Sequence, residues 1–150
     1  MLGRKDYAQE EFDNGKAAVG QQVAAYEELV RAIGSATDAH NVTAAREQFE
    51  TRFFKSMVLV LDRYFVHRLR QVTGKDANPL NEVEMLADSL MNNHGVLRVS
   101  NVIKWIPDQT VLKLKVGDTI QLTQADFDRL SAAFFADLRS KFLWARFVAS

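Results

Sequence analysis

Asparagine and histidine residues gather around a short helix that we expect at residues 78–93. Histidine titrates near neutral pH and can act as an acid or a base, and amide side chains can orient a small ligand. If the chain holds a ligand site, we predict that it is formed by His94, His67, Asn92, Asn93 and Asn78. The alternative, which we favour, is that the asparagines cap helices and turns through hydrogen bonds to the backbone.

The other titratable and nucleophilic residues form no recognisable catalytic or metal-binding motif. The chain has no cysteine, which excludes cysteine nucleophiles, zinc ribbons and redox dithiols. Its histidines, His40, His67 and His94, are not spaced four apart as on a zinc-binding helix. Glu84 and Asp88 share a helix face, which we interpret as solvated surface and not as a magnesium site. We therefore predict no catalytic residue, no metal and no cofactor, and we favour a protein that is not an enzyme.

The 19 basic and 19 acidic residues cancel, but they are distributed in blocks of alternating sign. Residues 1–50 carry nine acids and five bases, and residues 51–75 carry one acid and six bases. Residues 76–95 carry four acids and no base. Such blocks attract one another within a molecule or across a symmetric interface, although helix dipoles could also explain the pattern.

Neither nucleic acid nor a membrane is an expected partner. A zero net charge removes the general attraction for phosphate, and the aromatic residues beside the basic cluster at residues 63–70 fall on expected core positions. The longest apolar stretch, residues 57–61, is far shorter than the ~20 residues that cross a bilayer. We find no signal peptide at residues 1–10. The chain is therefore expected to be a cytoplasmic protein.

The first long segment, residues 6–33, has the apolar spacing of an amphipathic helix. Its apolar residues recur at steps of three, four and seven: Phe12, Val19, Val23, Tyr26, Val30 and Ile33. They form one stripe, which needs a partner to cover it. Gly15 and Gly20 each cost about 1 kcal/mol relative to alanine within a helix, so we expect a neighbouring helix to approach the backbone closely there.

The second long segment, residues 43–73, is expected to be the central helix because it is apolar on two faces. One face carries Phe49, Phe53, Met57, Val60 and Tyr64, and the other carries Phe54, Val58, Leu61, Phe65, Leu69 and Val72. We expect both faces to be buried. A straight helix of this length extends about 45 Å, which is longer than a compact domain of this size is wide. It should therefore bend, or part of it should meet a second copy.

Alternation of apolar and polar residues over residues 112–122 predicts a β-hairpin. The apolar positions are Leu112, Leu114, Val116, Ile120 and Leu122. If Val116 faces Ile120 and Leu114 faces Leu122, these four residues share one face, and residues 117–119 form the loop. Whether residues 97–105 add a further strand stays open.

The last helix should begin near Gln124, because Thr123 and Asp126 have the spacing of a capping box. The apolar row of this helix continues into an apolar tail after residue 142, which packs either on its own core or on another chain. Taken together, the patterns predict a single mainly helical α+β domain over residues 1–150, with about four helices and a β-hairpin inserted before the last helix.

Much of the chain resembles a group of uncharacterised actinobacterial proteins. The resemblance rests on Thr123 to Phe135, on the expected hairpin, and on Leu61, Asp62, Arg63, Tyr64, Phe65, Val66, His67, Arg68, Thr73, Gly74, Lys75, Asp76, Asn78, Pro79, Leu80, Asn81, Glu82, Val83 and Glu84. It implies a small cytosolic protein and assigns no activity and no functional residue.

The function that the sequence favours is that of a non-enzymatic structural or interaction protein that self-associates, most simply as a homodimer. The first helix, the long second helix and the apolar tail are the candidate contact surfaces. The alternative function is a small-molecule binder or enzyme that uses the asparagine and histidine residues around the third helix.

Overall fold

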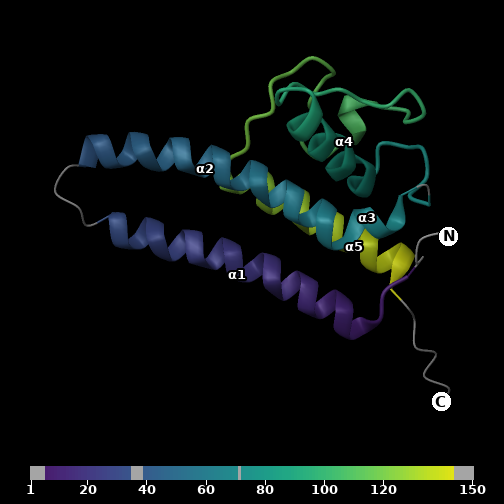
Figure 1. The fold of residues 1–150 in the computed structure, drawn as a ribbon, viewed down its shortest axis with the longest axis horizontal. Helices are drawn as coiled ribbons and strands as arrows, with labels where there is room; N and C mark the ends of the chain where they lie inside the picture. Colours follow the sequence, from purple (N-terminus) through teal and green to yellow (C-terminus); the bar gives the residue numbers. More distant parts are fainter. Residues whose placement is uncertain (1–5, 35–38, 71, 144–150) are drawn as a thin grey trace.

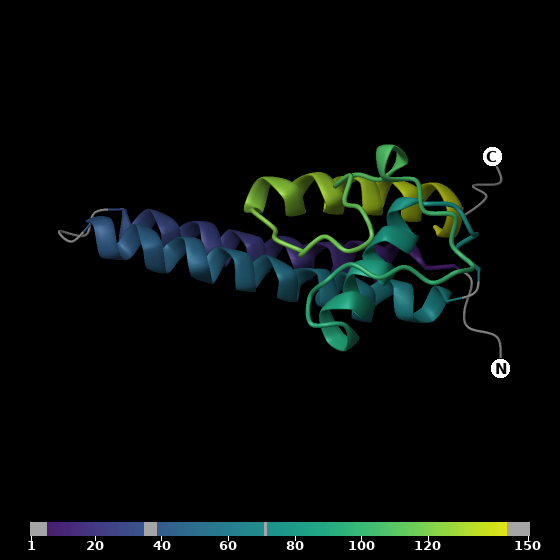
Figure 2. The same cartoon turned by 90° about the horizontal axis from the view of Figure 1, so that it is seen from above.

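The computed structural model describes residues 6–34, 39–70 and 72–143, and its regular secondary structure is helical. The elements are α1 (Gln9–Ile33), α2 (Ala39–Leu61), the π-helix η1 (Asp62–Val66), α3 (His67–Leu69), α4 (Pro79–Asn92), the 3-10 helix η2 (Pro107–Gln109) and α5 (Gln124–Phe142). Figures 1 and 2 show α1 and α2 side by side along the long axis, whereas α4 and α5 cover only one half of α2.

The expected second helix is a continuous rod in which α2, η1 and α3 follow one another. Backbone angles stay helical across both junctions, at Leu61 and at Val66, so the π-helical turn widens the rod without breaking it. The rod ends at Leu69, a few residues before the predicted end near Thr73. It forms the centre of the bundle, because α1, α4 and α5 all pack on it or on η1.

Burial of the rod follows the prediction in its middle but not at its ends. The face that contains Phe54, Val58, Leu61, Phe65 and Leu69 is buried throughout. On the other face Met57 is buried, but Phe49 is 46% exposed and Tyr64 is 50% exposed. The expectation that both faces are covered is therefore wrong at the two ends of that second face.

Phe65 is the hub where the rod, α1 and α5 meet. Its ring lies 5.4 Å from that of Tyr7, 5.9 Å from that of Phe134 and 5.4 Å from that of Phe135. Gly15 of α1 lies directly under the Phe65 ring, and a Cβ at this position would overlap the ring. The close approach expected at Gly15 is thus confirmed. The same expectation is wrong at Gly20, which is exposed. A Cβ at this position would meet no neighbouring atom within 4 Å.

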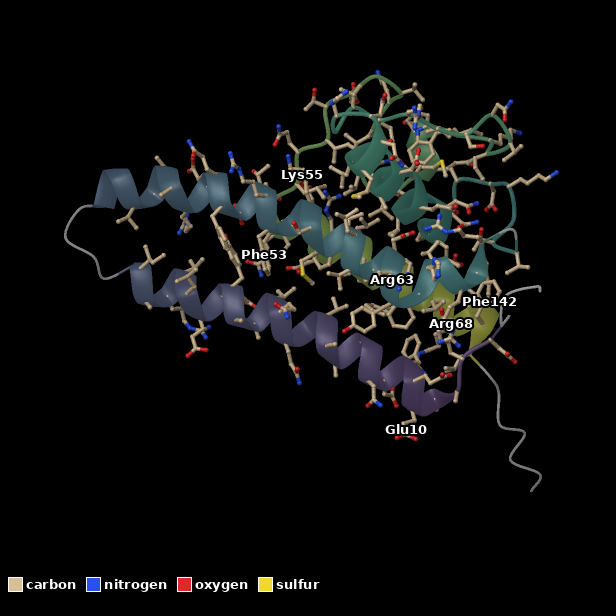
Figure 3. The ribbon with its side chains drawn as sticks, viewed as in Figure 1. Glu10, Phe53, Lys55, Arg63, Arg68 and Phe142 are labelled. Atoms are coloured by element: carbon tan, nitrogen blue, oxygen red, sulfur yellow. The ribbon has the colours of Figure 1, made fainter. Side chains whose placement is uncertain are left out.

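The two ends of the described chain meet beside this hub. Tyr7 pairs with Leu143 in a parallel bridge, and its backbone N–H donates to the Phe142 carbonyl at 2.8 Å. The Tyr7 hydroxyl donates to the backbone carbonyl of Phe65, and the Arg68 guanidinium lies 4.1 Å from the Tyr7 ring centroid. Figure 3 shows Arg68 and Phe142 at this end of the bundle, where α1 begins. These contacts tie the start of α1 to the end of α5.

An ion-pair network joins the rod to α4. The Arg70 guanidinium lies 2.9 Å from a carboxylate oxygen of Asp62 and 2.9 Å from one of Glu84. Arg70 belongs to the basic block of the sequence, and Glu84 belongs to the acidic block that follows. The expected attraction between these blocks therefore operates within the chain at this position.

The predicted β-hairpin is wrong, because the described residues contain no β-strand and residues 96–122 form a loop that wraps around α4. Lys113 has a φ of +57°, which breaks an extended strand. Val116 is 62% exposed whereas Ile120 is fully buried, so the two residues do not share a face. The residue that Thr119 pairs with is Val96, in an isolated antiparallel bridge, and residues 97–105 likewise form no strand.

Side chains satisfy the backbone donors that a hairpin would have used. The Glu82 carboxylate accepts from Val111 N–H at 2.8 Å and from Leu112 N–H at 2.9 Å. The Lys113 N–H donates to the Thr110 hydroxyl, and the Lys115 N–H donates to an Asp118 carboxylate oxygen. These short polar side chains compete with a strand ladder for the same groups. Alternation alone could not reveal these competing bonds.

Glu82 is the buried link between α4 and this loop. It is 1% exposed, and burial raises the pKa of its carboxyl, while the two backbone hydrogen bonds oppose this increase. An ionised carboxylate held in this way is acceptable in a core because both of its oxygens are bonded.

The contrast between Gly15 and Gly20 gives a first test. We expect Gly15→Ala to lower the free energy of unfolding, because the Phe65 ring is enclosed by other rings and cannot move aside. Gly20→Ala should raise it by about 0.4–1 kcal/mol, because the new methyl group meets no atom and the unfolded chain loses freedom. Urea denaturation measures both. Equal effects of the two substitutions would contradict the packing at Phe65.

The Glu82 contact gives a second test. In Glu82→Gln the amide oxygen can accept only one of the two N–H groups, and its NH2 group opposes the other donor. Stability should fall by about 1–3 kcal/mol. Hydrogen exchange at Val111 or Leu112 should become faster. Glu84→Gln is the control and should leave both amides protected. Unchanged exchange in Glu82→Gln would show that the loop does not depend on Glu82.

Candidate functional site

The α1–α2 hairpin extends well past the ends of α4 and α5 (Figures 1 and 2). We define its tip as residues 26–33 of α1 and 42–53 of α2. Between the two helices lies a cavity of about 300 Å³, which we name the tip groove. It is lined by Tyr26, Leu29, Val30, Ile33, Val42, Ala45, Arg46 and Phe49. The tip groove is the candidate functional site, because no residue of α4 or α5 lines it.

The lining of the tip groove is apolar except for Arg46 and the hydroxyl of Tyr26. Leu29 is 44% exposed and Phe49 is 46% exposed, so each helix contributes one large apolar side chain to the rim. Apolar side chains that are scattered singly over a surface need no explanation. These two face the same groove from two different helices, and we take this pair as a candidate contact surface.

Stacked aromatic rings form the floor of the hairpin at the inner end of the groove. The Tyr26 and Phe53 rings lie 5.4 Å apart and almost parallel, and the Phe53 and Phe49 rings lie 5.7 Å apart. Phe54 meets Tyr26 edge-on at 5.1 Å. Figure 3 shows Phe53 between the two helices. These rigid contacts hold α1 and α2 at a fixed separation, so the tip groove is preformed.

The pKa of the Tyr26 phenol reflects how far water is excluded from these stacked rings. Burial, together with the charge and hydrogen bond of Glu50, raises the pKa of this phenol to about 12, while the charge of Arg46 opposes this increase. The phenol is therefore neutral at physiological pH. Tyr26 supplies an apolar surface with one hydrogen-bonded polar atom.

Charges of both signs surround the tip groove in nearly equal number. Four acids and three bases lie along the tip: Glu27, Glu28, Glu47, Glu50, Arg31, Arg46 and Arg52. A surface with this balance neither attracts a polyanion nor repels a copy of itself.

The five residues predicted to form a ligand site are not brought together. Asn78 caps the start of α4, where its side chain accepts from Asn81 N–H and donates to the Thr73 carbonyl. Asn92, Asn93 and His94 lie at the other end of this 14-residue helix, about 20 Å away. Asn92 donates to Asp88 and Asn93 donates to the Val96 carbonyl, while His94 is exposed in a left-handed turn. His67 is exposed on α3.

A cavity of about 420 Å³ does lie beside α4, but none of these five residues lines it. Its polar lining includes Arg70, Thr73, Asn81 and Glu84. Asn81 is fully buried, accepts from the Thr73 hydroxyl and donates to the backbone carbonyls of Gly74 and Asp76. Arg70 is held by two carboxylates. These four polar side chains are thus already bonded within the protein.

The sequence names the two helices of the tip groove as candidate contact surfaces but does not locate the groove between them. The α1 side of the groove lies on the predicted apolar stripe, and Phe49 lies on one predicted face of the second helix. The length of the second helix already suggests that part of it meets a second copy. What the sequence does not show is which part, because that depends on where the shorter helices pack on the rod.

No family model, curated protein or solved structure matches this chain. The resemblance to uncharacterised actinobacterial proteins therefore stays a prediction. Within residues 6–34, 39–70 and 72–143, each helix falls short of the length and apolar character that a membrane span requires. Across the same residues, no three acidic, histidine or cysteine side chains are grouped so that they could bind a metal ion.

The shifted pKa of Tyr26 yields a third test. The folded-state pKa lies above the ordinary value of 10.0, so the stabilising effect is complete below pH 10 and is lost as the pH rises to about 12. We expect the free energy of unfolding of the unmodified chain to decrease more steeply over this window than that of Tyr26→Phe. Urea denaturation at a series of alkaline pH values measures the difference. Parallel curves would show that Tyr26 is not shielded.

Proposed function

We propose that this chain is a non-enzymatic interaction protein that forms a homodimer through the tip groove. The observation that carries the proposal is a preformed apolar groove, with Leu29 and Phe49 exposed on its rim, on a hairpin that α4 and α5 leave uncovered. Two helices alone cannot enclose a groove that runs between them. A third and a fourth helix can do so, as in four-helix bundles.

A second copy of the hairpin is the occupant that these features favour. In a two-fold dimer the same surface serves both partners, so it must offer a ridge as well as a groove. The tip offers both, because Leu29 and Phe49 project beside the groove of about 300 Å³. The nearly balanced charges around it allow two identical surfaces to approach each other. Burial of the exposed apolar area would then stabilise the pair.

Other classes of partner are less well supported. The tip lacks the excess of lysine and arginine that phosphate backbones and anionic lipids select. The alternative of a small-molecule site beside α4 remains, but Arg70, Thr73, Asn81 and Glu84 of that cavity are engaged in bonds within the protein. We therefore place function on the tip groove. We also propose that the protein acts in the cytoplasm, because a chain without cysteine fits a reducing compartment in which disulfides are rare.

Light scattering coupled to size exclusion tests the dimer. At micromolar concentration we expect a mass about twice the 17.0 kDa of one chain. Leu29→Glu and Phe49→Glu should each return the mass to that of one chain, because a charge cannot be buried in an apolar contact without a partner. Val116→Glu is the matched control, since Val116 is also exposed but lies in the loop around α4.

Circular dichroism should show that all three variants keep their helices, which separates loss of the contact from loss of the fold. An unmodified chain that stays at 17.0 kDa up to its solubility limit would overturn the proposal. So would a dimer that both tip variants preserve.

A further inference from the structure

We propose that the groove between α1 and α5 is a second self-association surface, on which two copies of the chain pack face to face around a two-fold axis. This α1–α5 groove encloses about 650 Å³. It shares no lining residue with the tip groove, so the proposal goes beyond the dimer described above and does not depend on it. The predicted apolar tail lies outside the described residues from residue 144 onward, and the proposal does not use it.

The two ends of the α1–α5 groove carry opposite charges. At one end lie Lys16 and Arg139, each over an aromatic ring of the opposite helix. At the other end lie Glu27 and Asp128, where burial and the charge of Glu27 raise the pKa of Asp128. All four residues are exposed, and within the described part of the chain none of them forms an ion pair. The groove therefore presents two cations and two acids that have no opposite charge beside them.

The spacing of these charges makes the groove complementary to itself. Lys16 and Glu27 are 11 residues apart on α1, and Asp128 and Arg139 are 11 residues apart on α5. Eleven residues make about three helical turns, or about 17 Å, so the charges of each helix lie on one face. A two-fold axis that crosses the middle of the groove places the cationic end of one copy on the acidic end of the other. A second copy thus supplies the missing opposite charges at both ends.

The middle of the groove is apolar and open to a close neighbour. Gly20 of α1 and Ala132 and Ala136 of α5 line it, and all three are exposed. Between them lie Val23, which is half-buried, and Phe135, which is buried. Two antiparallel helix pairs that pack face to face, as in a four-helix bundle, bury the groove of each pair in a common core. Small residues at the centre allow the backbones of two copies to approach closely.

Gly20 supports a partner on this face because it has no packing role within the described chain. Glycine in the interior of a helix lowers helix stability relative to alanine. At Gly15 the Phe65 ring accounts for the glycine, but a Cβ at Gly20 would meet no atom within 4 Å. A helix of a second copy gives Gly20 the close neighbour that its own chain does not.

Reversal of the charges at each end tests the proposal, in chains that also carry Phe49→Glu to remove the tip contact. One variant carries Lys16→Glu and Arg139→Glu, and its groove is acidic throughout. The other carries Glu27→Lys and Asp128→Lys, and its groove is basic throughout. We expect each variant alone to remain at 17.0 kDa, whereas an equimolar mixture should form a dimer of one copy of each. The chain with Phe49→Glu alone should also form a dimer.

Sedimentation equilibrium at concentrations up to about 1 mM measures these masses. Such concentrations are needed because exposed ion pairs stabilise a contact only weakly, so this contact should form above the micromolar range of the tip dimer. Added salt should weaken it, because salt screens exposed charges. The matched control carries Lys113→Glu and Lys115→Glu, which make the same change in net charge on the loop around α4 and should leave the dimer intact.

A second pair of variants does not alter these charges. With Phe49→Glu, Ala132→Arg should abolish the dimer because it fills the middle of the groove, whereas Ala125→Arg, on α5 but outside the groove lining, should preserve it. Circular dichroism checks that every variant keeps its helices. A chain with Phe49→Glu that stays at 17.0 kDa up to about 1 mM, a dimer that Ala132→Arg preserves, or helical reversed variants that do not pair when mixed would each overturn the proposal. None of these outcomes bears on the tip dimer, which is measured at micromolar concentration without Phe49→Glu.

Discussion

A mismatch in helix length governs this structure. The rod from α2 to α3 spans residues 39–69, about 46 Å, whereas α5 has 19 residues and spans about 28 Å, and α4 has 14 residues and spans about 21 Å. The shorter helices bury the inner half of the rod around Phe65, and the start of α5 reaches outward to Glu50. The tip groove is lined by α1 and α2 alone. The exposed tip groove is thus a direct result of where the chain places its helices.

The hub at Phe65 decides which half of the rod is covered. Gly15 admits the Phe65 ring against the backbone of α1, and Phe134 and Phe135 place α5 on the same ring. At the other end of the hairpin the stacked Tyr26, Phe53 and Phe49 rings join α1 to α2 directly. One aromatic cluster therefore builds the core, and the other presents a surface.

The four main helices could be read from the sequence because their apolar spacing, the Asn78 cap and the Thr123–Asp126 capping box are local signals. The predicted β-hairpin over residues 112–122 could not be excluded in this way. Its alternation is real, but Glu82 takes two of its backbone donors from about 30 residues away, and that contact exists only after α4 has folded. The candidate site was hidden for a related reason. Apolar spacing identifies a surface that needs a cover, but does not say whether the cover comes from the same chain.

A distance between two copies tests the proposed self-association through the tip groove most directly. Because the chain has no cysteine, Gln48→Cys carries a single spin label on the exposed face next to Phe49. We expect a defined distance between labels on two copies by pulsed dipolar spectroscopy, and a longer distance for Asp13→Cys at the far end of α1. Absence of dipolar coupling from Gln48→Cys, or a shorter distance at Asp13→Cys, would contradict it.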